Sequence, residues 1–232
     1  MVDIVLLQLP IWSIGCPPLG LALLKSYLAE NGISSKTFDI NAHLYSVRGI
    51  KYADYWEIEH GYDYCSSHDR MLEFYRDNRA LFLYYIDKIR QLDPKVVGCT
   101  CYGASIELTK IFLEDLSRFY PDFKHIIGGP EVAAYMKNAD ELISKEYIDA
   151  ICLGEGEISL VEYYRAIEED KGSPVPNIIY KRDGAVIREG SPATIKKLDH
   201  LPFPDFSDFN LKHYINSKVL PSYATRGCVN KC

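Results

Sequence analysis

The stretch Lys124-His-Ile-Ile-Gly-Gly-Pro-Glu131 decides the fold class of this chain. It joins a short apolar run, typical of a buried strand, to a turn of small residues, and apolar residues then recur at helical spacing. Two further units repeat this order: Lys95–Thr100 runs into Cys101-Tyr-Gly-Ala-Ser105, and Asp149–Leu153 runs into Gly154-Glu-Gly-Glu157. Strands that alternate with helices predict a parallel sheet covered on both faces.

The N-terminal residues extend the same alternation. Val2–Gln8 is an apolar run, Leu19–Asn31 has helical periodicity, and Ser34–Phe38 reads as the next strand. Further helices are predicted over Ile106–Phe119, Glu131–Ser144 and Glu157–Glu169. Five strands in this pattern favour an α/β fold with a Rossmann-like, flavodoxin-like doubly wound sheet.

Residues 41–92 interrupt the alternation, because they are far more numerous than a usual crossover needs. They are rich in aromatic residues and end in one predicted long helix, Asp69–Gln91. Two interpretations stay open for this insertion. It packs as a helical unit on the edge of the domain, or its aromatic side chains form a lid over a cofactor or a substrate.

A β-hairpin is predicted after residue 172, where Asn177–Lys181 and Ala185–Arg188 flank an Asp-Gly turn. Leu201-Pro-Phe-Pro-Asp-Phe206 follows, and its two prolines fix an extended backbone that is typical of a linker. Lys218–Thr225 reads as the first strand of another domain. The predicted organisation is a Rossmann-like domain over 1–172, a hairpin and linker over 173–217, and the start of a second domain over 218–232.

The composition narrows the function. The chain has 232 residues, 47% of them apolar, and a formal charge of −6. No block of five basic residues occurs, so a nucleic-acid partner is not indicated. The apolar N-terminus is too short for a membrane span and lacks the basic start of a signal peptide, which predicts a cytoplasmic protein with no membrane partner. Seven scattered cysteines are typical of core thiols plus a metal or cluster site.

The glycine turns follow the strands, and ligands of open parallel sheets bind beyond the carboxyl ends of the strands. Glycine lets the backbone approach a ligand closely, and a helix that starts after such a turn offers free N–H groups. No G-x-G-x-x-G follows the first strand, where Trp12-Ser-Ile-Gly-Cys-Pro-Pro18 stands, and G-x-x-x-x-G-K-[ST] is absent. This disfavours a nicotinamide or flavin dinucleotide and a nucleoside triphosphate.

The last residues, Thr225-Arg-Gly-Cys-Val-Asn-Lys-Cys232, carry two cysteines at C-x₃-C spacing. Cysteine thiolates are the usual ligands of iron–sulfur clusters. This segment resembles the opening of the C-x₃-C-x₂-C motif of the radical S-adenosylmethionine (SAM) superfamily, in which three cysteines hold a [4Fe–4S] cluster that cleaves SAM. The resemblance implies that Cys228 and Cys232 are cluster ligands and that the third cysteine would follow Cys232.

Four more motifs strengthen the resemblance. They occur in the order found in cobalamin-binding radical SAM enzymes: Pro17-Pro-Leu-Gly-Leu-Ala-Leu-Leu24, Gly128-Gly-Pro130, Gly154-Glu-Gly-Glu157 and Leu201-Pro-Phe-Pro-Asp-Phe206. In that subfamily the N-terminal Rossmann-like domain carries cobalamin, and many members are methyltransferases. The resemblance therefore implies that residues 218–232 begin the radical SAM barrel.

Fold position and resemblance together imply cofactor contacts at the strand ends. The predicted contacts are Cys16, Thr100, Tyr102, Ser105, Gly128, Gly129, Pro130, Glu131, Gly154, Glu155 and Gly156. The D-x-H-x-x-G signature, whose histidine ligates cobalt in other B12 proteins, is absent, so the implied cofactor is cobalamin without a protein histidine ligand. Buried, inert thiols are the interpretation for Cys99 and Cys152.

The leading hypothesis is a cobalamin-dependent radical SAM methyltransferase. It would use a [4Fe–4S] cluster, SAM and methylcobalamin on a small-molecule or peptide substrate, with flavodoxin or ferredoxin as the reductant of the cluster. Two alternatives stay open: a radical SAM cyclase or oxidoreductase, and a cofactor-free docking domain of a radical SAM enzyme. The 232 residues alone are not expected to catalyse a reaction, because two cysteines do not complete the cluster site.

Overall fold

A seven-stranded mixed sheet organises the computed structural model, which describes residues 2–48, 50–57, 61–134, 139–169, 173–188, 190 and 193–227. The strands are β1 (Ile4–Gln8), β2 (Ser35–Asp39), β3 (Val96–Thr100), β4 (Lys124–Gly128), β5 (Ala150–Cys152), β6 (Ile178–Arg182) and β7 (Ala185–Ile187). Their spatial order is β2-β1-β3-β4-β5-β6-β7, and the first five are parallel. The order 2-1-3-4-5 is that of flavodoxin-like folds, so the predicted fold class is confirmed.

The predicted β-hairpin is present, and it extends the same sheet. β6 pairs antiparallel with β5, and Cys152 lies opposite Ile178. Asp183 and Gly184 form the turn with positive φ values of 49° and 77°, as a two-residue hairpin turn requires. The sheet therefore ends in two antiparallel strands beyond its five parallel ones.

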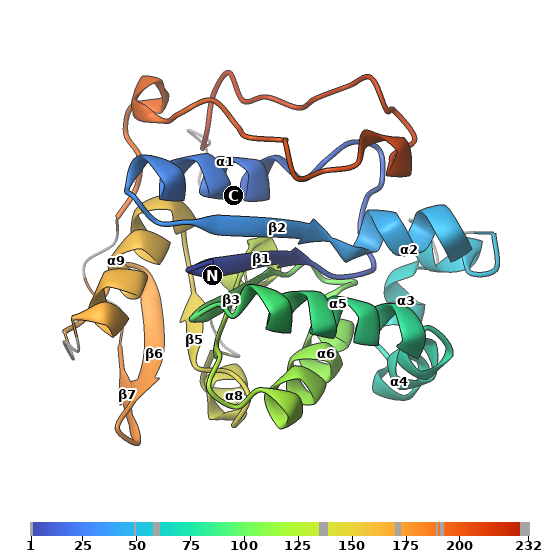
Figure 1. Ribbon diagram of the computed structural model, residues 1–232, viewed down its shortest axis with the longest axis horizontal. Coiled ribbons are helices and arrows are strands. Elements are labelled where there is room, and N and C mark those ends of the chain that lie inside the picture. Colours follow the sequence, from blue (N-terminus) through green and yellow to red (C-terminus); the bar gives the residue numbers. More distant parts are fainter. Residues whose placement is uncertain are drawn as a thin grey trace.

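Helices cover both faces of the sheet (Figure 1). One face carries α1 (Leu19–Glu30) and α9 (Gly156–Glu168), and the other carries α5 (Arg79–Leu92) and α6 (Ile106–Phe119). The alternation along β1 explains the two cores, since successive side chains of a strand point to opposite faces. Ile4 and Leu6 pack on the side of α1 and α9, whereas Val5 and Leu7 pack on the side of α5 and α6.

One predicted helix is divided in the structure, so this prediction was wrong in detail. Asp69–Gln91 forms α4 (His68–Asp77) and α5, and Asn78 ends the first helix and begins the second. The Asn78 side chain donates a hydrogen bond to the Phe74 carbonyl at 2.8 Å, and asparagine favours such caps over a helix interior. The predicted helix Glu131–Ser144 overlaps α7 (Pro130–Ala134) and α8 (Ala139–Ser144), and residues 135–138 lie outside the described residues.

The insertion packs as part of the core. Its elements are α2 (Ile40–Arg48), a 3₁₀ turn at Ala53–Trp56, α3 (Gly61–Cys65), α4 and α5. α2 and α3 lie beyond the carboxyl ends of β1 and β2 (Figure 1). Phe74 is the centre of an aromatic group, with the rings of Tyr52 and Tyr55 at 4.9 and 5.2 Å from its own. The insertion is thus packed as a helical unit on the domain, and its Tyr45, Tyr55 and Trp56 also line a cavity described below, so both interpretations stay open.

The segment that follows the hairpin runs over α1 and along the edge of β2 (Figure 1). It includes 3₁₀ turns at Leu198–His200 and Leu211–His213. Residues 218–225 form no strand here, so that prediction is not realised; a strand needs a neighbour for its backbone hydrogen bonds, and none of the described strands pairs with this segment.

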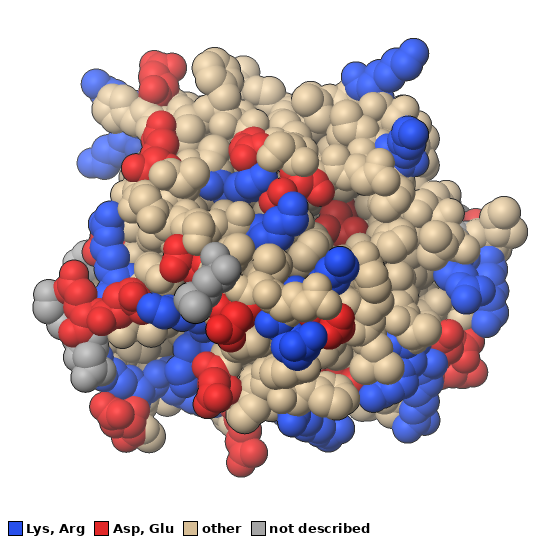
Figure 2. Space-filling view, viewed as in Figure 1, with Lys and Arg blue, Asp and Glu red and all other residues tan. Residues whose placement is uncertain are grey.

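Acidic and basic side chains are interspersed on the face shown in Figure 2 and do not gather in one basic patch there. Within the described ranges, none of the helices combines the length and the apolar character that crossing a bilayer demands.

Candidate cofactor-binding site

An apolar slot of about 220 Å³ opens between the sheet and the helices α1 and α9. Gly98 of β3 contributes to its wall, where a Cβ atom would lie 3.2 Å from Leu6 Cδ2. A glycine inside a strand often marks a place where a ligand comes close to the backbone. The slot is lined by Leu6, Gly20, Leu21, Leu24, Gly98, Cys99, Thr100, Tyr102, Ile126, Gly128, Gly129, Pro130, Cys152, Gly154, Gly156, Glu157, Leu160 and Tyr223.

The turn after β4 packs backbone against backbone on the turn after β3. The Cys101 N–H donates to the Gly128 carbonyl at 2.7 Å, and the Glu131 N–H donates to the Cys101 carbonyl at 3.2 Å. Gly129 has a φ of +102°, and a Cβ atom there would lie 2.7 Å from the Cys101 oxygen. Glycine is therefore required at this position both for the backbone angle and for the space.

The start of α9 forms the opposite wall of the slot. A Cβ atom at Gly156 would lie 3.2 Å from Leu24 Cδ2, so the glycine allows α9 to approach α1 closely. Asn177, from the start of the hairpin, supports the turn: its amide donates to Ser159 Oγ at 3.0 Å and to the Ala193 carbonyl at 2.8 Å. The slot is thus bordered by well-packed elements.

A stacked aromatic pair includes one residue of the slot lining. The rings of Trp12 and Tyr102 lie 3.8 Å apart and nearly parallel. Tyr102 lines the slot, and its backbone N–H is held by Ser105 Oγ at 3.0 Å. The Trp12 N–H donates to Asn41 Oδ1 at 3.1 Å, so the insertion fixes the loop that follows β1.

A second cavity, of about 960 Å³, adjoins the slot on the other side of this pair. Its lining comes from the loop after β1, the turn after β3 and the insertion: Ile11, Trp12, Ser13, Ile14, Gly15, Tyr45, Ala53, Tyr55, Trp56, Glu57, Gly103, Ala104, Glu131 and Ile215. Trp56 donates its indole N–H to Asn41 at 3.0 Å, so the ring is the part left to contact a ligand. Burial raises the pKa of Glu131, one of the two carboxyl groups in this lining.

An ion pair connects the C-terminal segment to α9. Arg226 Nη2 lies 2.7 Å from Glu157 Oε1, and Arg226 Nη1 lies 3.6 Å from Glu155 Oε1. Glu155 also accepts the Ile195 N–H at 2.6 Å. Tyr223 lines the slot, and its ring lies 5.6 Å from the Arg226 guanidinium carbon.

The structure brings most of the predicted contacts together. The slot is lined by Thr100, Tyr102, Gly128, Gly129, Pro130, Gly154 and Gly156. The other four lie outside this lining: Ser105 is buried in its turn, Glu131 lines the second cavity, Glu155 pairs with Arg226, and the half-buried Cys16 lines neither cavity. All eleven stay predictions as cofactor contacts. Cys99 and Cys152 are buried, as predicted.

The two predicted cluster ligands, Cys228 and Cys232, fall outside the described residues. Among the residues that are described, no group of three His, Cys, Asp or Glu side chains is placed to hold a metal ion. The sequence reasoning missed the apolar walls of the slot, such as Leu6 and Leu160. In the sequence these leucines have the pattern of ordinary core residues. Gly98, inside a predicted strand, was the one residue whose type indicated a close approach to the backbone at this wall.

Comparison with known proteins supports the resemblance inferred from the motifs. No family model matches the chain. The anaerobic magnesium-protoporphyrin IX monomethyl ester cyclase of Cereibacter sphaeroides is 26% identical over 190 residues, which are 78% of this chain and 28% of the cyclase. The cyclase of the same name from Rubrivivax gelatinosus is 29% identical over 156 residues, which are 63% of this chain and 27% of the cyclase.

Two solved structures share the fold. The cobalamin-dependent SAM radical enzyme OxsB, with aqua-cobalamin bound, superposes with a TM-score of 0.59 and 16% identity over 92% of this chain and 25% of that protein. The radical SAM methyltransferase TsrM from Kitasatospora setae, with cobalamin and a [4Fe–4S] cluster bound, superposes with a TM-score of 0.50 and 17% identity. The match covers 85% of this chain and 30% of that protein. The family resemblance is thus confirmed: this chain is similar to the B12-binding domain of cobalamin-dependent radical SAM enzymes, over about a quarter of their length.

Proposed function

We propose that this chain binds cobalamin and forms part of a cobalamin-dependent radical SAM enzyme. The observation that carries the proposal is the convergence of the glycine turns on one apolar slot at the carboxyl edge of the sheet. Ligands of open α/β sheets bind at this edge. Cobalamin, when bound, supplies a cobalt centre that can carry a methyl group or electrons.

The two cavities fit the two parts of such a cofactor. The slot is narrow and apolar, and its residues would hold the heterocyclic base of the nucleotide tail. The larger cavity on the other side of Trp12 and Tyr102 offers aromatic side chains and room for a macrocycle. The proposed cofactor has no protein histidine ligand, since none of the residues that line either cavity is a histidine.

The reaction of the whole protein is a separate question. The chain spans only about 27–28% of the two cyclases that it matches, and both carry the name of a cyclase. This favours a radical SAM cyclase or oxidoreductase over the methyltransferase that the motifs first indicated. We propose a small-molecule or peptide substrate and a flavodoxin or ferredoxin as reductant for either reaction.

Methyl-labelled SAM distinguishes the two reactions when it is incubated with a protein that carries all three cysteines of the motif. Label in the product supports methyl transfer. A cyclised product without label supports the cyclase or oxidoreductase.

Titration of the purified chain with hydroxocobalamin tests the proposed cofactor. Corrin absorbance that elutes with the protein at one equivalent after gel filtration is the expected result. Leu24→Trp adds a bulky ring to the slot, and it should abolish retention. Leu83→Trp is the matched control, because Leu83 is exposed on α5 and lines neither cavity. A folded wild-type chain that retains no cobalamin would leave a cofactor-free docking domain as the function.

A further inference from the structure

The ion pair between Arg226 and Glu157 joins two parts of the chain that have different predicted roles. Glu157 lies in the first turn of α9, at the wall of the slot. Arg226 stands two positions before Cys228, the first predicted cluster ligand. The 2.7 Å contact therefore links the wall of the slot to Arg226, in the segment that precedes the predicted cluster ligands in the sequence.

The carboxylate of Glu157 needs this partner. Its side chain is only 6% exposed, and that of Arg226 is 19% exposed. A buried carboxylate that loses its cationic partner is strongly destabilised, whereas a pair on the open surface contributes little. Removal of Arg226 should therefore cost more than removal of one partner of an ordinary surface pair of this protein, such as Arg118 with Glu114 on α6.

Few other contacts hold the C-terminal segment. Within the described part of the chain, no backbone–backbone hydrogen bond involves residues 220–227. Tyr223 is 54% exposed and touches the slot, and the Arg226 guanidinium lies over its ring. Arg226 thus holds the segment at its far end, and Tyr223 lies between this anchor and the linker.

We propose that Arg226 is a positioning residue: by pairing with Glu157 it holds residues 220–227 against the slot, and it couples the docking of this segment to the occupancy of the slot. The coupling rests on the proposed cobalamin function, whereas the anchor does not. Reciprocity follows from thermodynamic linkage, because a ligand that favours the docked segment must itself bind more tightly when the segment is docked.

Limited chymotrypsin cleavage after Tyr223, followed by mass spectrometry of the released C-terminal peptide, measures the docking. Arg226→Met should accelerate this cleavage by about tenfold, as expected for a segment that has lost a half-buried charged contact. Arg226→Lys keeps the charge and should restore most of the protection. Arg118→Met removes a surface ion pair of α6, and chymotrypsin should cleave this variant at the wild-type rate.

The double variant Glu157→Gln/Arg226→Met separates docking from a general loss of stability. Chymotrypsin should cleave the double variant as fast as it cleaves Arg226→Met. The double variant should nevertheless regain the wild-type midpoint of thermal unfolding, because no unpaired buried carboxylate remains. Saturating hydroxocobalamin should slow cleavage of the wild type and have little effect on Arg226→Met, which should bind the cobalamin more weakly.

The outcomes are distinct. Cleavage of Arg226→Met at the wild-type rate overturns the anchor. Cobalamin binding that leaves cleavage of the wild type unchanged overturns the coupling while the proposed cofactor stands. A wild type that binds no hydroxocobalamin overturns both the proposed cofactor and the coupling, and the cofactor-free comparison of the variants still decides the anchor.

Discussion

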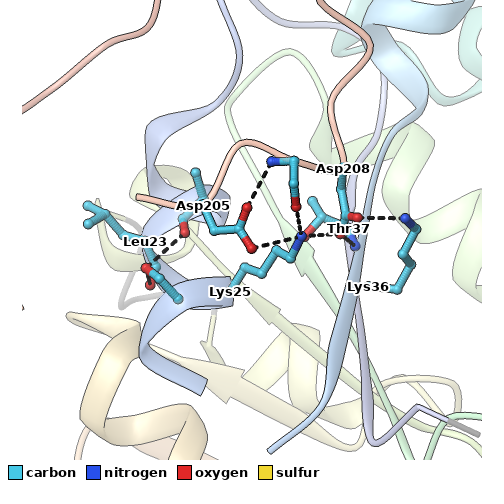
Figure 3. A network of polar contacts seen from close by, with 9 residues as sticks. Leu23, Lys25, Lys36, Thr37, Asp205 and Asp208 are labelled. Carbon is cyan, nitrogen blue, oxygen red and sulfur yellow. Dashed lines mark hydrogen bonds and ion pairs between the residues drawn. The ribbon is translucent and has the colours of Figure 1, made fainter. Parts of the chain in front are cut away.

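The Asp208 carboxylate accepts the backbone N–H of Thr37 at 2.9 Å, so a side chain of the linker occupies the open edge of β2 (Figure 3). Lys25 of α1 and Lys36 of β2 approach the same carboxylate at 3.0 and 2.5 Å. Asp205 joins from the same linker, with its carboxylate 3.0 Å from Lys25. An unpaired strand edge is thereby covered by the segment that the sequence marked as a linker.

Asp208→Asn should detach the linker and lower the free energy of unfolding by about 2–3 kcal/mol, since two lysines lose their shared, mostly buried partner. Urea unfolding followed by circular dichroism measures the change. Asp199→Asn, at an exposed position of the same segment, should change the stability by less than ~0.5 kcal/mol. Equal effects of the two substitutions would contradict the role given to Asp208.

Asp208 should also make the protein sensitive to acid. Burial acts to raise its pKa, but the hydrogen bonds from Lys36, the Thr37 N–H and Lys25 outweigh burial and hold the pKa below 3.8. The carboxylate therefore stabilises the fold above about pH 4, and this contribution is lost as the pH falls through the folded-state pKa. The stability difference between wild type and Asp208→Asn should accordingly shrink below about pH 4.

Asp39 should have the opposite pH dependence. Its complete burial raises the pKa from 3.8 to about 6, although the Tyr214 hydroxyl donates a hydrogen bond to it at 2.7 Å. The folded state then holds a proton that the unfolded state has lost, so stability falls as the pH rises from about 4 to about 6, by about 3 kcal/mol. Asp39→Asn should remove this slope. Urea unfolding at a series of pH values tests it, and parallel curves for the two proteins would refute the prediction.

Gly129→Ala should disrupt the turn after β4. The positive φ and the 2.7 Å approach to the Cys101 carbonyl leave no room for a methyl group, so a cost of at least ~3 kcal/mol and loss of hydroxocobalamin retention are expected. Gly184→Ala is the control, because Gly184 also has a positive φ but no atom within 4 Å of the added Cβ. It should cost about 1 kcal/mol and leave cofactor retention unchanged.

The cysteines should differ widely in reactivity. Burial raises the pKa of Cys65 and of Cys101 to about 12, whereas Cys16 is partly exposed. Iodoacetamide reacts with the thiolate, so at about pH 8 both buried thiols should be alkylated at least ~100-fold more slowly than Cys16. Mass spectrometry of the digested protein gives the three rates. As a control, the chain unfolded in urea should react with iodoacetamide at all three cysteines. The prediction would be contradicted if Cys101 in the folded protein were alkylated as fast as Cys16.

The sequence by itself determined the parallel core. Strands such as Lys95–Thr100 and helices such as Ile106–Phe119 have strong local patterns, and the structure places them within a residue or so of the predicted bounds. The break between α4 and α5 at Asn78 was not visible in the sequence, because helical periodicity continues across this residue. The helix ends there because the Asn78 side chain bonds to the Phe74 carbonyl. Local pattern thus fixes the existence of an element better than its ends.

Only the tertiary structure decided which side chains form the site. The glycine turns were visible in the sequence because their positions depend on backbone geometry. Leu24 and Leu160 line the slot from separate helices, and Trp12 meets Tyr102 across two loops, so no spacing along the chain connects them. The pairing of Arg226 with Glu157 likewise joins residues 69 positions apart. Such contacts depend on how the sheet, helices and linker pack together, which the local sequence does not specify.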